Sequence, residues 1–368
     1  MSEFSPSRRI RTSADTCHNR RRPEVEPSTV ARQITPSYQS VVDGQRPNGI
    51  IPGLDAIRGI AAVLVALYHA PMLSPFGATK AYLAVDLFFV LSGYVLARAY
   101  APQFDAGLTP VKFLAKRLRR LYPLYLASVA IAVPLILIKM TAGTIDARWQ
   151  TVASLGANAA GLPSIFTDAL YPLNVPAWSI LVELGANAML ACSWPWLTKL
   201  RLTAVVATAA IYLSVVAVHH GSLSGGSEWT DLPLTIGRVA FSFPLGVLLT
   251  KINLSFAAIP EWLILGCIAL IMLCDIQSAI FDLFCVVCVF PAIILCGISM
   301  PTSPFWSWMG QRSYGIYVLH VPILRWLTGA TKGLEANWVV MLCGFMALVI
   351  AGSVVAEQMV SRRVQVKR

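Results

Sequence analysis

The stretch LDAIRGIAAVLVALYHA, residues 54 to 70, shows which class of fold this chain adopts. Its apolar residues nearly fill the ~20 positions that an α-helix needs to cross a bilayer. Two ionisable side chains, Arg58 and His69, interrupt it. Because a charge at bilayer depth costs about 2.5 kcal/mol or more, such groups are functional-site candidates. We therefore expect a membrane-spanning helix that carries part of a site.

The composition places the whole chain among membrane proteins. Hydrophobic residues make up 56% of its 368 residues and charged residues only 13%, whereas about 25% of the residues of a soluble domain are charged. Apolar runs of near-spanning length recur from Leu54 to Glu357. We predict an all-α, polytopic transmembrane helix bundle of about ten spanning helices. They lie near residues 54–71, 80–99, 121–139, 176–197, 202–218, 234–250, 261–274, 279–298, 313–328 and 337–356.

The distribution of basic residues predicts the orientation of these spans. The segment 151–166 is apolar but rich in small residues, so we interpret it as interfacial or re-entrant; an eleventh span there would invert everything after it. With ten spans and a cytoplasmic N-terminus, nearly all Lys and Arg residues fall on the cytoplasmic side, the pattern typical of inner-membrane proteins. The exceptions are Lys80, Lys139, Arg148 and Lys332. We therefore expect a multi-pass protein of the inner membrane with both termini cytoplasmic.

Three parts of the chain differ in composition. Residues 1–49 are rich in Arg, Ser and Pro without apolar periodicity, so we predict a disordered cytoplasmic tail. Residues 50–358 form the membrane domain and residues 359–368 a second basic tail. We see no cleavable signal peptide and expect the first span to act as the anchor. The net charge of +11 indicates contact with anionic lipids at the cytoplasmic face rather than with nucleic acid.

No metal site is expected. Cys285 and Cys288 form a CxxC pattern, but no second ligand pair accompanies them, and buried cysteines behave as small hydrophobic residues.

Few Asp, Glu, Arg, Lys or His residues lie inside the predicted spans, away from their ends. They are Arg58, His69, Asp86, Glu183, Arg238, Asp282, His320 and Arg325.

Three of these residues, from three helices, are predicted to lie at one depth. His69 shares a helix face with Arg58, on the order of 16 Å away along the axis. The second and fourth spans enter the membrane from the outer side, and they place Asp86 and Glu183 at a depth similar to that of His69. Ser179 lies one turn before Glu183. A His supported by a carboxylate can act as a general base toward a hydroxyl. Either carboxylate qualifies as its partner; we favour Asp86, which lies on the adjacent span.

The cytoplasmic stretch KFLAKRLRRLYPLY, residues 112–125, concentrates basic side chains where the third span begins. Membrane topology alone explains some of them. Guanidinium groups such as Arg117 and Arg120 also bind phosphate in forked geometry. A phosphate-rich cytoplasmic ligand is therefore a second interpretation.

The ninth span begins GQRSYGIYVLH, residues 310–320. Ser313, Tyr317 and His320 fall on one helix face, with Tyr314 adjacent. We interpret the Tyr and Ser residues as interfacial anchors. We expect His320 in the inner half of the span, away from His69, as a helix-packing residue; a direct catalytic role is the alternative.

Taken together, these stretches resemble the integral-membrane acyltransferase-3 family, which includes bacterial glycan O-acetyltransferases and macrolide acyltransferases. Besides the stretch at 54–70, with its Arg and His, the resemblance rests on VDLFFVLSGYVL (85–96), KRLRRLYPLY (116–125), PAWSILVE (176–183) and GQRSYGIYVLH (310–320), in the order of the family. It covers most of residues 50–358.

The resemblance implies an O-acyltransferase with no permanently bound cofactor. It implies a cytoplasmic acyl-coenzyme A donor, acetyl-coenzyme A being the common one, and a hydroxyl acceptor on a glycan, glycolipid or similar molecule. On this basis Arg58, Arg117 and Arg120 are predicted to bind the donor. The predicted catalytic residues are His69, Asp86, Ser179 and Glu183. We expect direct transfer with His69 as general base; an acyl-His intermediate is the alternative. A transporter or channel with a proton relay is the rival function.

Overall fold

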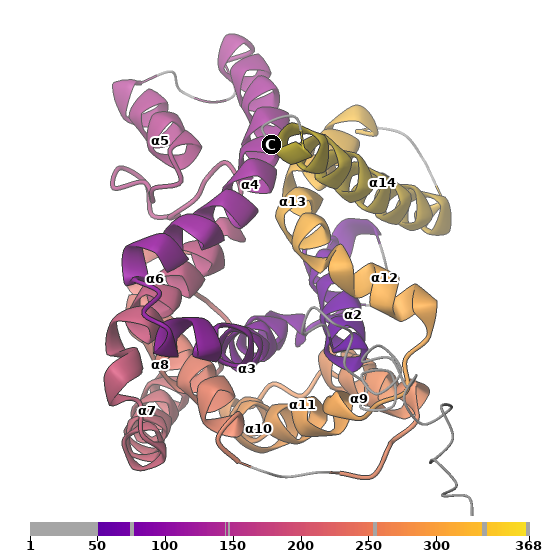
Figure 1. Cartoon of the computed structure of the whole chain (residues 1–368). Helices are drawn as coiled ribbons and strands as arrows, with labels where there is room; N and C mark the ends of the chain where they lie inside the picture. Colours follow the sequence, from indigo (N-terminus) through magenta and orange to yellow (C-terminus); the bar gives the residue numbers. More distant parts are fainter. Residues whose placement is uncertain are drawn as a thin grey trace, which may run out of the picture.

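The computed structural model describes residues 51–365, apart from residues 74–76, 144, 146–147, 253–255 and 333–336. The predicted tail at 1–49 lies outside the described residues, while residues 359–365 of the predicted basic tail continue the last helix. Figure 1 shows an all-helical arrangement. The only β pairing among the described residues is an isolated bridge between Ala169 and Glu228.

The helices keep the order expected from the apolar runs. They are α2 (Pro52–Tyr68), α3 (Ala84–Asp105), α4 (Pro110–Thr141), α5 (Trp149–Ala159), α6 (Ala177–Ser193), α7 (Lys199–His220), α8 (Leu232–Leu249), α9 (Glu261–Leu273), α10 (Ala279–Phe284), α11 (Phe290–Ile298), α12 (Pro304–Gln311), α13 (Ser313–Ala330) and α14 (Trp338–Gln365).

Local sequence signals set several helix ends. Thr109 precedes α4, and its hydroxyl accepts a hydrogen bond from the Lys112 amide. Thr198 caps α7 in the same way. Both satisfy amides that the first helical turn leaves unpaired. Gly221, the residue that follows α7, has a φ of 83°, a left-handed conformation that favours glycine.

Six segments of the described chain are long and apolar enough to cross a membrane. They are Ala81–Asp105, Pro110–Thr141, Lys199–His220, Trp229–Leu249, Ala279–Ile298 and Trp338–Met359. The other four predicted spans are helices as well: α2 and α6 have 17 residues each, α9 has 13, and α13 has 18 but contains Arg325. The chain is thus a multi-pass membrane protein, and the number of ten spans and their orientation stay predictions.

The segment predicted to be interfacial or re-entrant holds a short helix and a folded loop. Helix α5 has 11 residues, too few to cross a bilayer. The loop after it is tied to α13, because Arg325 donates to the Pro172 carbonyl oxygen at 2.7 Å and Asn174 donates to that of Val318 at 2.8 Å. These bonds hold the loop that precedes α6 against α13.

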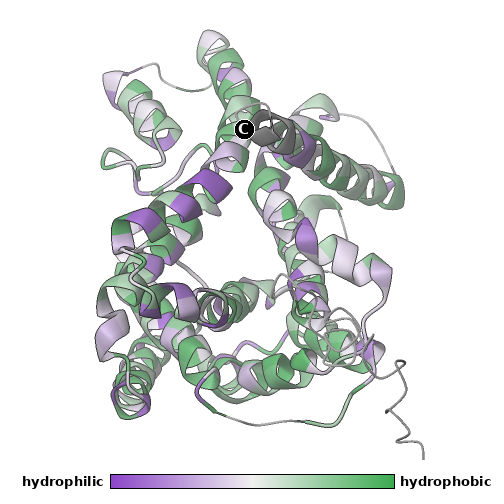
Figure 2. Ribbon diagram, viewed as in Figure 1, coloured by the Kyte–Doolittle hydropathy of each residue, from purple (hydrophilic) through white to green (hydrophobic). Residues whose placement is uncertain are grey.

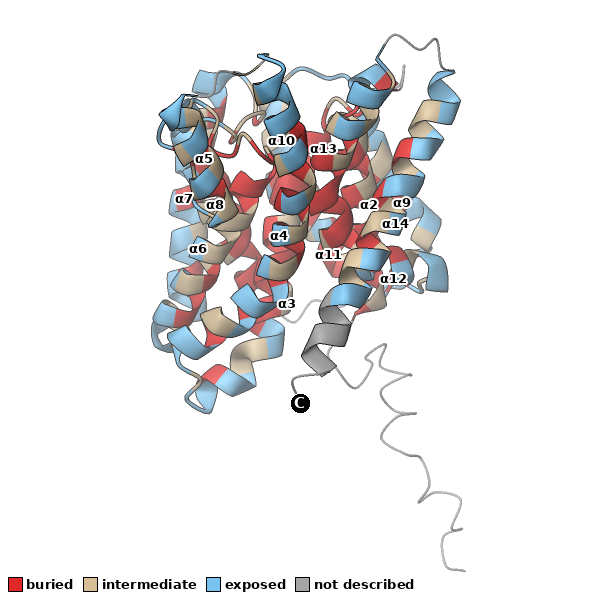
Figure 3. Cartoon of the chain, turned by 90° about the horizontal axis from the view of Figure 1, so that it is seen from above, coloured by how far each residue is buried: buried red, intermediate tan, exposed pale blue. Residues whose placement is uncertain are grey.

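Glycines bring α3 and α8 into close contact. A Cβ atom on Gly93 would overlap the carbonyl of Phe243, and one on Gly246 would overlap the carbonyl of Val90. Small residues at such contacts let two backbones approach closely. Buried residues lie where helices face one another, and exposed residues lie on the outer surfaces, as Figure 3 shows. Many of the outer helix surfaces are hydrophobic (Figure 2), as a bilayer requires.

Candidate active site

A cavity of about 300 Å³ lies among the helices that surround the centre of Figure 1. Residues of α2, α3, α4, α6, α12 and α13 line it. Its polar lining consists of Asp55, Arg58, Ser92, Arg117, Arg120, Ser179, Glu183, Gln311, Ser313, Tyr314 and Tyr317. The structure therefore brings five of the seven predicted site residues to one cavity. His69 and Asp86 are not among its lining residues.

Three guanidinium groups form an arginine cluster in this cavity: Arg58, Arg117 and Arg120. Arg120 is exposed, Arg58 is partly buried, and Arg117 is only 7% exposed. The cluster thus extends from the protein surface into the interior. Two carboxylates, Asp55 and Glu183, also line the cavity, so positive charge is in excess there.

Glu183 contacts the arginine cluster rather than His69. Its Oε1 accepts hydrogen bonds from Arg117 Nη2 at 3.0 Å and from the Ser92 hydroxyl at 2.6 Å. The buried Nε of Arg117 has no hydrogen-bond partner among the described residues. An unpaired buried donor is costly, and the described residues leave this one unsatisfied.

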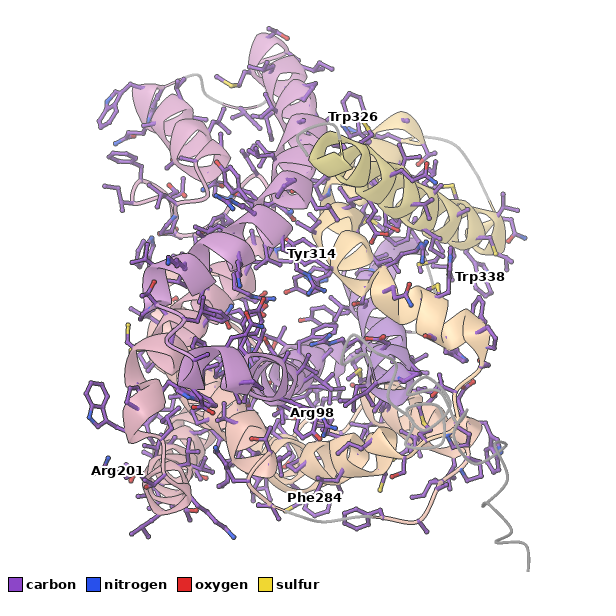
Figure 4. The ribbon with its side chains drawn as sticks, in the orientation of Figure 1. Arg98, Arg201, Phe284, Tyr314, Trp326 and Trp338 are labelled. Atoms are coloured by element: carbon purple, nitrogen blue, oxygen red, sulfur yellow. The ribbon has the colours of Figure 1, made fainter. Side chains whose placement is uncertain are left out.

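Ser179 lies in a small group of hydroxyls at the start of α6. Its Oγ is 2.7 Å from the Tyr317 hydroxyl, and both hydroxyls lie within 3.2 Å of the Pro176 carbonyl oxygen. Tyr314, one turn before Tyr317, donates to the Leu121 carbonyl oxygen at 2.8 Å. Figure 4 shows Tyr314 directed from α13 toward the central space. These tyrosines come from the motif at 310–320; the sequence favoured interfacial anchors there, whereas both tyrosines line the cavity.

The prediction that His320 lies away from His69 is wrong. His320 Nε2 lies 3.2 Å from His69 Nδ1, and the two rings are 4.9 Å apart. His69 Nδ1 is also 2.9 Å from the Val65 carbonyl oxygen. His69 is partly buried and His320 fully buried. The error arose because depth along one helix says little about how two helices are shifted against each other.

The preferred pairing of Asp86 with His69 is also wrong. Asp86 is fully buried and binds Arg238 of α8, with Nη2 to Oδ2 at 2.7 Å and Nε to Oδ2 at 3.0 Å. Arg238 donates further to the carbonyl oxygens of Tyr82 and Gly225, each at 2.8 Å. Among the described residues, neither Asp86 nor Glu183 hydrogen-bonds to His69. Asp86 therefore joins α3 to α8 and does not orient the imidazole.

Lys80, predicted to lie on the non-cytoplasmic side at the start of the second span, is fully buried. Its Nζ donates to Asp282 Oδ1 at 2.9 Å and to the Tyr82 hydroxyl at 2.8 Å, and that hydroxyl donates to Asp282 Oδ2 at 2.7 Å. We call Asp86, Arg238, Lys80 and Asp282 the paired network, because each charge has an opposite partner. Tyr82 links its two halves, through its hydroxyl and its backbone oxygen.

Comparison with known proteins identifies the family of this chain. The acyltransferase domain family matches residues 51–357. This chain belongs to the acyltransferase-3 family. A comparison with solved structures found no match.

Two relatives show what this chain is similar to. Protein 2 in the picA locus of Rhizobium radiobacter is 35% identical over 178 residues, 45% of this chain and 93% of that protein. The peptidoglycan O-acetyltransferase OatA of Listeria monocytogenes is 25% identical over 336 residues, 78% of this chain. The acyltransferase spans about half of OatA, since the match covers 51% of that relative.

Proposed function

We propose that this acyltransferase moves an acyl group, acetyl being the expected one, from cytoplasmic acyl-coenzyme A to a hydroxyl of a carbohydrate or related acceptor. His69 is the general base. The observation that carries the proposal is the arginine cluster, which extends from the surface into the cavity. The name of the relative OatA supports a carbohydrate acceptor.

The arginine cluster suits the phosphate groups of coenzyme A. Guanidiniums bind phosphate through paired, charge-assisted hydrogen bonds. Arg120, the exposed member, would meet the nucleotide end first, while Arg58 and the unsatisfied Nε of Arg117 lie further in. Under the predicted topology this opening faces the cytoplasm, where acyl-coenzyme A is available.

The inner part of the cavity leads toward the histidine pair. Phe88 and Tyr317 both line it, with ring centroids 5.7 Å apart. The Tyr317 ring is 5.9 Å from that of His320, which contacts His69. An acyl group attached to a phosphopantetheine arm would therefore approach the base past these aromatic rings.

The proposed step transfers the acyl group directly. The acceptor oxygen forms a bond to the thioester carbonyl carbon while His69 takes the hydroxyl proton. The carbon–sulfur bond breaks, and the imidazolium returns the proton to the coenzyme A thiolate. General-base assistance of this kind contributes about 10²- to 10⁴-fold.

The test is acyl transfer from radiolabelled acetyl-coenzyme A by the purified protein in liposomes, with glycan acceptors. We expect His69→Ala to lower the rate about 100-fold or more, with the protein still folded. The control is His219→Ala, because His219 is exposed on α7. Full activity of His69→Ala would remove the base assignment, and proton-coupled flux without acyl transfer would favour the rival transporter function.

A further inference from the structure

We propose that His320 is a positioning residue: its Nε2 accepts a hydrogen bond from His69 Nδ1 and, together with the Val65 carbonyl oxygen, keeps the proton of His69 on Nδ1 and its lone pair on Nε2. The proposal rests on the proposed function, in which His69 acts as the base. It gives His320 the part that a carboxylate plays in many catalytic pairs.

The Val65 carbonyl determines the tautomer of His69. A carbonyl oxygen only accepts hydrogen bonds, and it lies 2.9 Å from His69 Nδ1. That nitrogen must therefore carry the proton. In the neutral ring the remaining nitrogen, Nε2, is then the basic one, which is the form a general base requires.

The Ile316 carbonyl determines the tautomer of His320 in the same way. It lies 3.3 Å from His320 Nδ1, so this nitrogen donates and Nε2 has the lone pair. His320 Nε2 is therefore ready to accept from His69 Nδ1 across the 3.2 Å contact. The two carbonyls thus assign the two rings independently and give compatible partners.

The opposite assignment is inconsistent with these contacts. If His320 Nε2 donated to His69 Nδ1, the lone pair of His69 Nδ1 would face the Val65 oxygen, and that of His320 Nδ1 would face the Ile316 oxygen. Each contact would then join two acceptors within 3.3 Å. A buried polar contact of that kind is destabilising.

His320 is well placed to stabilise the ring when it takes up a proton. Imidazolium carries hydrogen on both nitrogens, and its Nδ1–H would share the Val65 oxygen and His320 Nε2. Among the described residues no carboxylate hydrogen-bonds to either ring. The ionisable side chains whose rings contact the pair are Tyr68 on α2 and Tyr317 on α13, and Tyr82 packs on Tyr68.

The first test does not depend on activity. Solid-state NMR of the full chain in liposomes, with ¹⁵N-labelled histidine, reports tautomers and nitrogen pairs across a hydrogen bond. We expect two neutral rings protonated at Nδ1 and one ¹⁵N–¹⁵N correlation between them, which His320→Gln removes. A His69 protonated at Nε2, or no correlation, would overturn the proposal.

The second test compares His320→Gln with His320→Leu in the acyl-transfer assay. Glutamine retains an acceptor oxygen, whereas leucine has none. We expect His320→Leu to lose about 10- to 100-fold in kcat with the KM for the donor unchanged, and His320→Gln to keep most of the rate. The acid limb of the pH–rate profile should move to lower pH in His320→Leu, because the imidazolium loses an acceptor. His219→Leu is the matched control.

The outcomes separate the two proposals. Equal losses in both His320 variants, or an unmoved acid limb, would mean a purely structural role. A wild-type protein that shows the ¹⁵N correlation but transfers no acyl group would overturn the proposed function while leaving the histidine pairing intact.

Discussion

The arginine cluster and the paired network consist of similar residues, yet they differ in whether each charge has a partner. In the paired network all four side chains are fully buried, with partners at 2.7 and 2.9 Å. In the arginine cluster three cations share two carboxylates along an open cavity, and one buried nitrogen is unsatisfied. Burial alone thus does not mark a binding site in this protein; an unmatched charge beside a cavity does.

The comparison changes the interpretation of Asp86. The sequence motif suggested a catalytic carboxylate, whereas the structure places it among charges that hold helices together. Removing one partner from a buried ion pair leaves an uncompensated charge, which is far more costly than losing an exposed pair.

The largest expected effect is that of Asp86→Asn. It leaves Arg238 buried without its anion, so we expect a loss of about 3–5 kcal/mol in the free energy of unfolding. Thermal unfolding of the purified protein in detergent measures this, with Arg120→Gln as a control of unchanged stability. Wild-type stability combined with lost transfer would return Asp86 to the catalytic residues.

Lys80→Met tests the other half of the paired network. We expect a loss of about 3 kcal/mol, because Asp282 keeps the Tyr82 hydroxyl and the Leu223 amide as donors. The matched control is Lys332→Met, since Lys332 is exposed. If both variants unfold at the wild-type temperature, the network contributes nothing to stability.

A smaller effect, on binding rather than stability, is expected for Arg120→Gln. Hydrogen bonds to charged groups contribute about 1.5–3 kcal/mol, so the KM for acyl-coenzyme A should rise about 10- to 100-fold with the unfolding temperature unchanged. Arg119→Gln is the matched control, because Arg119 is an exposed neighbour that does not line the cavity. Equal KM values for the two variants would contradict donor binding by the arginine cluster.

The smallest effect concerns salt. Since the cluster opens to solvent at Arg120, screening should raise the KM for the donor about two- to threefold between low salt and 0.5 M. The paired network is buried, so the unfolding temperature should respond less. A KM independent of ionic strength would argue against a phosphate-binding role.

The sequence predicted the helices well and their mutual contacts poorly. Apolar runs located every span candidate because helix formation in lipid depends on local composition. The RLRR motif at residues 117–120 indicated Arg117 and Arg120 as candidate site residues, because membrane topology alone does not require so many basic residues in so short a stretch. The predictions for His320 and Asp86 were wrong because they relied on depth along single helices. Depth gives neither the rotation of a helix nor its shift against a neighbouring helix.

The amino-acid sequence by itself determined the membrane class, the helical order and the family, all of which follow from local hydropathy and short motifs. Only the tertiary structure decided which buried polar side chain meets which: Asp86 meets Arg238 across 152 residues of chain, Lys80 meets Asp282 across 202, and His69 meets His320 across 251. The physical reason is that a buried polar or charged group must find a partner where helices pack, and packing depends on the shapes of all the helices together.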